Sequence, residues 1–199
     1  MARLGPSITA LLGLLALSCS DGKDDPQSTQ PSSRDPLDIT LPAPSLRRLT
    51  QAQYGRAVRD LFGSHVVIPT SLEPDETIDG LLAIGSGMTT ISPRGVEQYE
   101  RAAYEIAAQA LDTPKRRAQL LPCLKDADFA DPCVEGFFHD FGLRVWRRPL
   151  TLLEADRLTG ISLRAGAILG DEYAGLEYGI AAMLQSPHFL FRAELGESV

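Results

Sequence analysis

The sequence is poor in the residues from which catalytic and redox sites are built. Its 199 residues include three cysteines, three histidines and one tryptophan. No C-x-x-C-H motif is present, so the chain carries no covalent c-type haem of its own. The histidines, His65, His139 and His188, lie far apart, and no H-E-x-x-H or G-x-S-x-G motif occurs. The sequence therefore predicts no cofactor and favours a non-enzymatic role.

Basic residues are also in the minority. Nineteen Lys and Arg oppose 26 Asp and Glu, which gives a net charge of −7. No stripe of basic side chains is visible, so nucleic acid is not an expected partner. An acidic exterior favours solubility and weakens binding to anionic lipids or polysaccharides.

No apolar run is long enough to span a bilayer, which takes about 20 residues. The run Ile8–Leu17 follows Arg3 and has the length of a secretory signal core. It leads into Ala16-Leu17-Ser18-Cys19, where a small residue precedes a cysteine. This pattern predicts a lipoprotein signal peptide over residues 1–18 and acylation of Cys19, which would anchor an exported protein to a bacterial membrane. An ordinary cleaved signal peptide, which would leave Cys19 as a thiol, is the alternative.

The segment after Cys19 predicts a tether. Residues 19–44 are rich in Pro, Ser and Asp and contain almost no large apolar residue before Leu37. Such a composition does not bury enough surface to offset the entropy of ordering, so we expect disorder here. Folding should begin near Ser45.

Cys123 and Cys133 form an even pair once Cys19 is set aside. In an oxidising compartment, two cysteines ten residues apart predict a disulfide. A redox pair or a set of metal ligands is the alternative, which the absence of a C-x-x-C spacing disfavours.

The folded region predicts an all-α protein of helical, bundle-like modules over residues 45–112 and 113–199. Thr50 with Gln53 and Thr151 with Glu154 have the spacing of capping boxes, and Ser92-Pro93 is a further helix start. Gly63 and Gly170 are helix stops. Asp131-Pro132 repeats the cap-plus-proline signal, and hydrophobic periodicity predicts helices over 51–62, 93–111, 115–121, 132–145, 152–169 and 172–185.

The same periodicity predicts which side chains face the core. For the helix 132–145 these are Val134, Phe137, Phe138, Phe141 and Val145. For the helix 152–169 they are Leu158, Ile161, Ala165 and Ile168.

An acidic, loop-rich connection spans residues 64–91. Its carboxylates Asp75, Glu76 and Asp79 could gather a hard cation such as Ca²⁺. The spacing of an EF-hand is absent, and a solvated acidic turn is the alternative.

Three arginines surround the single tryptophan. Arg144, Arg147 and Arg148 flank Trp146, a combination suited to anion binding or cation–π contacts, and we treat the four as a candidate docking surface. In the alternative, the arginines bond helix-terminal carbonyls and carboxylates such as Glu154 or Asp156.

Two sets of motifs resemble a known family. The segment Arg47-Arg48-Leu49-Thr50-x-x-Gln53-Tyr54, with the motifs Val58–Gly63 and Ser92–Tyr99, resembles the third domain of the PSD series. The segment Phe141–Thr151, with Leu184–Arg192, resembles the fifth domain. The resemblance implies exported planctomycete or myxobacterial proteins of unknown function, often lipoproteins and often beside c-type cytochrome modules. Family members usually continue into a further domain, whereas this chain stops at Val199, which is expected of a truncated member.

Two functions follow as hypotheses. In the first, the chain is a membrane-tethered, non-catalytic docking or structural module of an exported assembly that contains c-type cytochrome or polymer-processing proteins. In the second, it is part of an exported enzyme acting on polymers, with Glu73, Asp75 and Asp79 in acid–base or metal-binding roles.

Overall fold

The computed structural model describes residues 45–82, 85, 87, 90–123 and 131–194. All of them belong to one compact unit, which spans residues 41–199. The signal peptide 1–18, Cys19 and the tether 19–44 lie outside the described residues, so these remain predictions.

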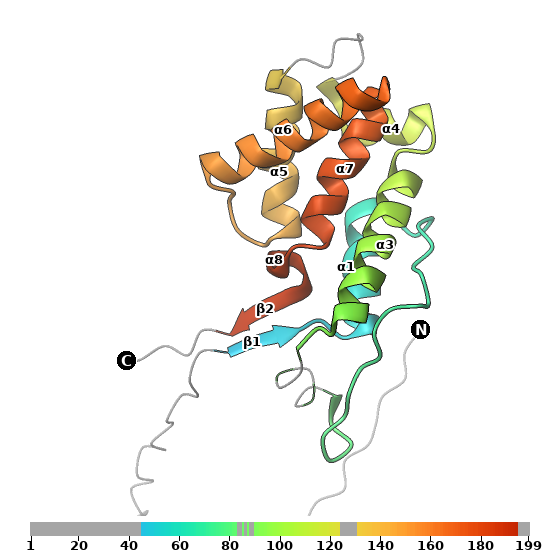
Figure 1. The fold of residues 1–199 in the computed structure, drawn as a ribbon, viewed down its shortest axis with the longest axis vertical. Helices are drawn as coiled ribbons and strands as arrows, with labels where there is room; N and C mark the ends of the chain where they lie inside the picture. Colours follow the sequence, from blue (N-terminus) through green and yellow to red (C-terminus); the bar gives the residue numbers. More distant parts are fainter. Residues whose placement is uncertain (1–44, 83–84, 86, 88–89, 124–130, 195–199) are drawn as a thin grey trace, which may run out of the picture. The chain divides into compact units, whose positions relative to one another are not determined.

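The described residues are mainly helical, which confirms the predicted fold class (Figure 1). The helices are α1 (Gln51–Phe62), α3 (Pro93–Ala110), α4 (Pro114–Leu120), α5 (Asp131–Val145), α6 (Leu152–Leu169), α7 (Glu172–Leu184) and α8 (Pro187–Leu190). None of the described helices is both long enough and apolar enough to cross a membrane.

The predicted helix signals work as the sequence indicates. Thr50 with Gln53 and Thr151 with Glu154 form reciprocal capping boxes at the starts of α1 and α6. Ser92 caps α3, with Pro93 in its first turn. Gly170 ends α6 with φ 66°, a left-handed conformation that glycine adopts without steric cost.

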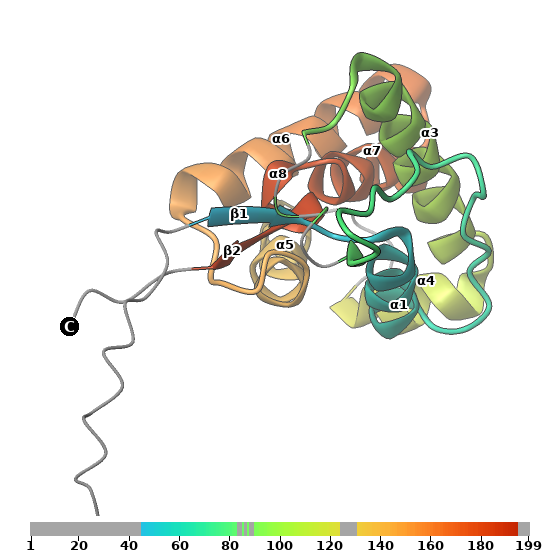
Figure 2. The same cartoon turned by 90° about the horizontal axis from the view of Figure 1, so that it is seen from below.

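Two short strands, which the sequence did not predict, join the beginning and the end of the described chain. Strands β1 (Ser45–Arg48) and β2 (Phe191–Glu194) pair antiparallel, with Ser45 opposite Glu194 and Arg48 opposite Phe191. Figure 2 shows this small sheet at one end of the unit, beside α8. The sheet therefore joins the start of the PSD3-like segment to the end of the PSD5-like segment.

A single core holds the helices together. Helix α7 contacts α6 along its length and also packs against α3, so it is central to the unit (Figure 1). The predicted apolar face of α5 is confirmed, because all five of its predicted side chains are buried: Val134, Phe137, Phe138, Phe141 and Val145.

The predicted core face of α6 is confirmed at Leu158, which is buried, and is wrong at Ile168, while Ile161 and Ala165 are half-buried. Ile168 is 84% exposed, whereas Ser162 is 2% exposed and Gly166 is also buried. The face toward α7 is made of small residues because Gly175 of α7 comes very close to the backbone of α6 at Ser162 and Gly166. Close approach of the two backbones, rather than insertion of large side chains, defines this helix pair.

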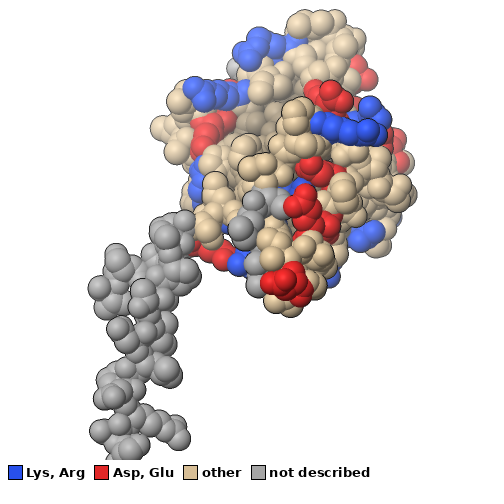
Figure 3. All heavy atoms as spheres, turned by 60° about the horizontal axis from the view of Figure 1, so that its bottom comes forward, with Lys and Arg blue, Asp and Glu red and all other residues tan. Residues whose placement is uncertain are grey.

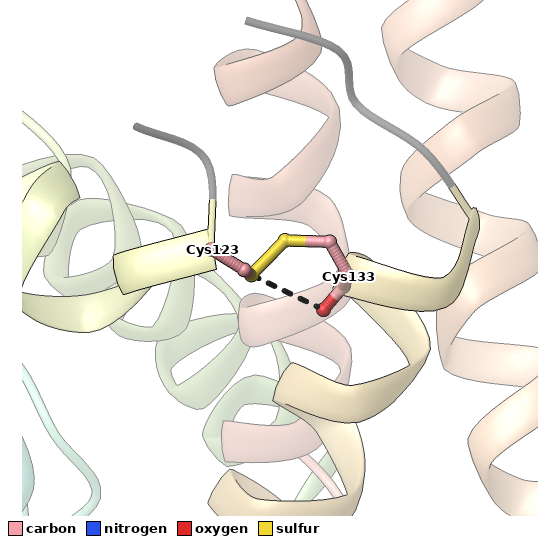
Figure 4. The surroundings of a disulfide bond; sticks show 2 residues. All are labelled: Cys123 and Cys133. Carbon is pink, nitrogen blue, oxygen red and sulfur yellow. Dashed lines mark hydrogen bonds between the residues drawn. A yellow bond between two sulfur atoms is a disulfide. The ribbon is translucent and has the colours of Figure 1, made fainter. Parts of the chain in front are cut away.

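The predicted disulfide between Cys123 and Cys133 is confirmed. It links the turn after α4 to the first turn of α5, with the two Cα atoms 5.9 Å apart (Figure 4). The bond fixes where α5 starts relative to α4.

Breaking this disulfide should destabilise the fold. By chain entropy, a loop of this size contributes about 2–3 kcal/mol, so the variant C123S/C133S should lose about that much free energy of unfolding. Urea unfolding of the oxidised protein, the reduced protein and the double variant checks this. The reduced protein and the variant should agree, and an unchanged midpoint in both would contradict the prediction.

Candidate functional site

The end of α5 turns sharply at the arginine–tryptophan segment. After Trp146, Arg147 adopts φ 59°, a left-handed backbone conformation that is uncommon for a residue other than glycine. Pro149 follows and does not continue the helix. Such backbone strain persists where the surrounding contacts fix it, and it is concentrated at functional positions.

The side chain of Arg147 lies against α8 and β2. Its Nη2 donates to the carbonyl oxygens of His188, Phe189 and Phe191 at distances of 3.0–3.1 Å. These bonds satisfy carbonyls at the end of α8 and at the outer edge of β2, but they do not neutralise the charge of the guanidinium. Partial burial, together with the positive charge of Arg192, lowers the pKa of Arg147.

Arg148 is held by a carboxylate. Its two terminal nitrogens donate to the two oxygens of Glu154 at 2.9 and 2.7 Å, a bidentate geometry. Arg148 also donates to Nε2 of His188 at 3.1 Å. Because an arginine only donates, this contact is a hydrogen bond in the tautomer whose Nε2 carries no proton.

Trp146 connects this segment to the core. Its indole N–H donates to the carbonyl oxygen of Met183 at 3.2 Å, and its ring lies 4.8 Å from the ring of His188, centroid to centroid. The guanidinium of Arg148 lies 5.3 Å from the centroid of the indole, within cation–π range.

These residues surround a hollow of about 410 Å³, which we call the arginine hollow. It is lined by Leu46, Trp146, Arg147, Arg148, Pro187, His188, Phe191, Arg192 and Ala193. Within the described residues, Arg192 has no hydrogen-bond or ion-pair partner, and no carboxylate pairs with Arg147. Two positive charges therefore face the hollow without a counter-ion from the described chain.

Arg144, the fourth predicted docking residue, lies elsewhere. It donates to the carbonyl oxygens of Asp60 and Leu61 at 3.2 and 3.5 Å, near the end of α1. The structure thus brings Trp146, Arg147 and Arg148 together and separates Arg144 from them. It also adds His188 and Arg192, which the sequence did not mark as docking residues although both lie in the motif Leu184–Arg192.

The acidic loop is tied to a buried arginine. Arg48 is 2% exposed, and it donates to Glu73 Oε2 at 3.0 Å and to the carbonyl oxygen of Pro74 at 2.9 Å. Glu73 also accepts from the backbone N–H of Ser92, and Asp75 accepts from that of Gln51. Glu73 and Asp75 therefore hold the starts of α3 and α1 in place.

Glu76 and Asp79, the other predicted cation ligands, are exposed. Asp79 adopts φ 51° in the turn that pairs Ile78 with Leu81. Across the described residues, no group of three or more His, Cys, Asp or Glu side chains is arranged to hold a metal ion.

Charges of both signs are distributed over the surface beyond the arginine hollow. Figure 3 shows Lys and Arg interspersed with Asp and Glu, in several places in direct contact, without a single-sign field over the visible face. The two arginines at the hollow stand on a protein whose net charge is negative.

The Glu154–Arg148 pair should make stability depend on pH. The bond from Arg148, with the N–H of Thr151, lowers the pKa of Glu154 from 4.5 to about 2. The pKa of Glu154 is lower in the folded state than in the unfolded state. The contribution of the pair to the free energy of unfolding is therefore complete above pH 4.5, and it is lost as the pH falls toward 2. We expect this partly exposed pair to contribute on the order of 1 kcal/mol to the free energy of unfolding.

Glu154→Gln isolates this contribution, because glutamine already serves the same capping position in α1. Urea unfolding should show the variant less stable than the wild type at pH 7, with a smaller difference at pH 3 and almost none at pH 2. A difference that is the same at both pH values would contradict the prediction.

Family models match both halves of the described unit. Residues 47–112 match PSD3, described as a protein of unknown function (DUF1587), and residues 133–194 match PSD5, described as a protein of unknown function (DUF1595). Together the matches cover more than half of the chain. No curated protein and no solved structure gives a significant match. The chain belongs to the PSD domain family and carries a PSD3 domain followed by a PSD5 domain.

Proposed function

We propose that this chain is an exported, lipid-anchored docking module of an extracytoplasmic assembly, and that the arginine hollow is its docking site. The observation that carries the proposal is the pair of arginines, Arg147 and Arg192, that face the hollow without a carboxylate from the described chain. A partner that brings negative charge would supply what the described chain does not.

Several features support an extracytoplasmic location. The sequence before Ser45 has the pattern of a lipoprotein leader and a tether. The disulfide between Cys123 and Cys133 is of a kind that persists in oxidising compartments. The resemblance that links such domains to c-type cytochrome or polymer-processing proteins suggests which assemblies to examine first.

The chemistry of the acidic loop favours a structural role over the enzymatic alternative. Glu73 and Asp75 are engaged with Arg48 and with backbone N–H groups, so their oxygens already have partners. The arginine hollow offers hydrogen-bond donors and aromatic surface, which suit binding.

The anchoring half of the proposal is tested by the intact mass of the mature protein from membranes. Cleavage before Cys19 with acyl chains on Cys19 is the expected result. Cys19→Ser should release the protein from the membrane fraction, and an unmodified N-terminus in the wild type would overturn the anchor.

The docking half is tested by site-specific photo-crosslinking in cells. A photo-reactive residue at Leu46, which is 63% exposed at the rim of the hollow, should give a discrete crosslinked product, whereas one at Ile168, which is 84% exposed on α6, should not. Equal crosslinking at the two positions would overturn the assignment of the docking site to the hollow.

A further inference from the structure

The outer edge of β2 has unpaired backbone groups beside the arginine hollow. Leu49 N–H donates to the carbonyl of Leu190, and hydrogen-bonded pairs alternate along an antiparallel ladder. The next hydrogen-bonded pair is therefore Arg47 with Arg192, and the N–H and C=O of Ala193 point away from β1. Ala193 is exposed, and no other described strand covers this edge.

The neighbouring position on the same edge is closed. The N–H of Phe191 donates to Pro187 O, and its carbonyl accepts from Arg147. The open edge therefore starts at Ala193, directly beside the Arg147 guanidinium.

The charge at this edge is positive. Glu194, the acidic residue of β2, is paired with Arg47 at 3.0 Å, which leaves Arg192 unpaired among the described residues. Arg192 and Arg147 stand close enough for the charge of Arg192 to lower the pKa of Arg147. An anionic group between them would relieve this repulsion and could accept charge-assisted hydrogen bonds.

The hollow also has an apolar part. Leu46 is 63% exposed at its rim, and Trp146, His188 and Phe191 form its wall. A volume of about 410 Å³ accommodates one or two side chains of a peptide.

From these features we propose that β2 accepts an extended acidic peptide segment of a partner protein as a third strand. The peptide backbone pairs with Ala193, one carboxylate lies between Arg147 and Arg192, and an apolar side chain enters the hollow against Trp146. This inference rests on the proposed docking function and names its partner class. Strand addition draws on main-chain hydrogen bonds, which an anionic lipid or sugar polymer does not offer in this form.

The only tryptophan of the chain lies in the hollow, so its fluorescence reports binding directly. The experiment titrates the full mature chain, in detergent, with an acetylated hexapeptide of alternating valine and aspartate. Three matched probes accompany it: the valine–lysine peptide, the valine–aspartate peptide with N-methylated backbone, and vesicles of phosphatidylglycerol.

The acidic peptide should shift the Trp146 emission saturably. Arg192→Glu should weaken binding about tenfold or more, since it removes a charge-assisted bond and adds repulsion. Ala193→Pro should weaken it similarly, because it removes the outward N–H without touching the charge. Arg56→Glu makes the same charge change at an exposed residue of α1, away from the hollow, and should bind like the wild type.

Three results would overturn the inference. If the lysine peptide bound as tightly as the valine–aspartate peptide, charge would have no role in binding. If the N-methylated peptide bound as tightly, the hollow would be a simple anion site and strand addition would be ruled out. Binding of the vesicles alone would assign the hollow to a lipid surface. Each result leaves the acylation of Cys19 and the crosslinking at Leu46 to be judged separately.

Discussion

Replacing Arg48 with methionine should cost about 3–5 kcal/mol of unfolding free energy, a large share of the stability of a domain of this size. Methionine fills most of the space but removes the cation that pairs with Glu73 and lies 3.8 Å from Asp75. The side chains of both acids are less than one-fifth exposed, so their charges would remain in a poorly solvated place. Urea unfolding monitored by circular dichroism measures the loss.

The neighbouring arginine of the same strand is the matched control. Arg47 pairs with Glu194, and the two side chains are 33% and 50% exposed. Arg47→Met should therefore change stability by no more than about 1 kcal/mol. Adding Glu73→Gln to Arg48→Met should restore part of the loss, because one unpaired charge disappears. Equal losses for Arg47→Met and Arg48→Met would contradict the role given to the buried pair.

Gly175→Ala should cost about 3 kcal/mol or more, at the upper end of the range for overpacked cores. A Cβ at this position of α7 would lie 2.6 Å from the Cα of Gly166 and closer still to the carbonyl oxygen of Ser162. These are backbone atoms, which do not rotate aside, so α6 and α7 would have to separate. The measured loss is a net value, since alanine favours a helix over glycine by about 1 kcal/mol.

Gly136→Ala is the same substitution in a helix with open space. A Cβ at Gly136 of α5 would meet no atom within 4 Å, so only the helix preference acts. We expect a gain of about 0.5–1 kcal/mol. Thermal unfolding of both variants should show midpoints that move in opposite directions, and a loss of similar size in both would contradict the close approach of α6 and α7.

Local signals predicted much of the fold. The capping boxes at Thr50 and Thr151 and the stop at Gly170 lie where the sequence indicates, because these bonds form between residues near in sequence. The face of α5 is equally clear, since large apolar side chains recur there at helical spacing.

Features that depend on distant contacts were not predictable in this way. Helix α6 presents Ser162 and Gly166 to its partner, and hydrophobic periodicity does not detect a contact made of small residues. Strands β1 and β2 have four residues each and pair across almost the whole described chain, so neither carries a signal of its own.

The candidate site shows the same difference between features set by local sequence and features set by distant contacts. The composition of the segment Trp146–Arg148 made it a candidate docking surface, and the structure places all three residues at the hollow. Arg147 and Arg148 also make the contacts of the alternative, with carbonyl oxygens and with Glu154. His188 and Arg192 join them only through the packing of α8 and β2, and Arg144 points to α1 because the helix turns it away. The residue types therefore indicated a binding chemistry, whereas the tertiary structure determines which residues line the hollow.

The pairing of β1 with β2 has a mechanical consequence for a protein that is pulled through its ends. Ser45 and Glu194 are opposite each other at the outer end of the two strands. A force applied through the chain before Ser45 and after Glu194 would load this pair first and then each following pair in turn. The strands would open like a zipper, one pair at a time, instead of sharing the load as sheared strands do. Tension would therefore release the sheet, and with it the edge beside Arg147, while the disulfide at the far end of α5 still holds.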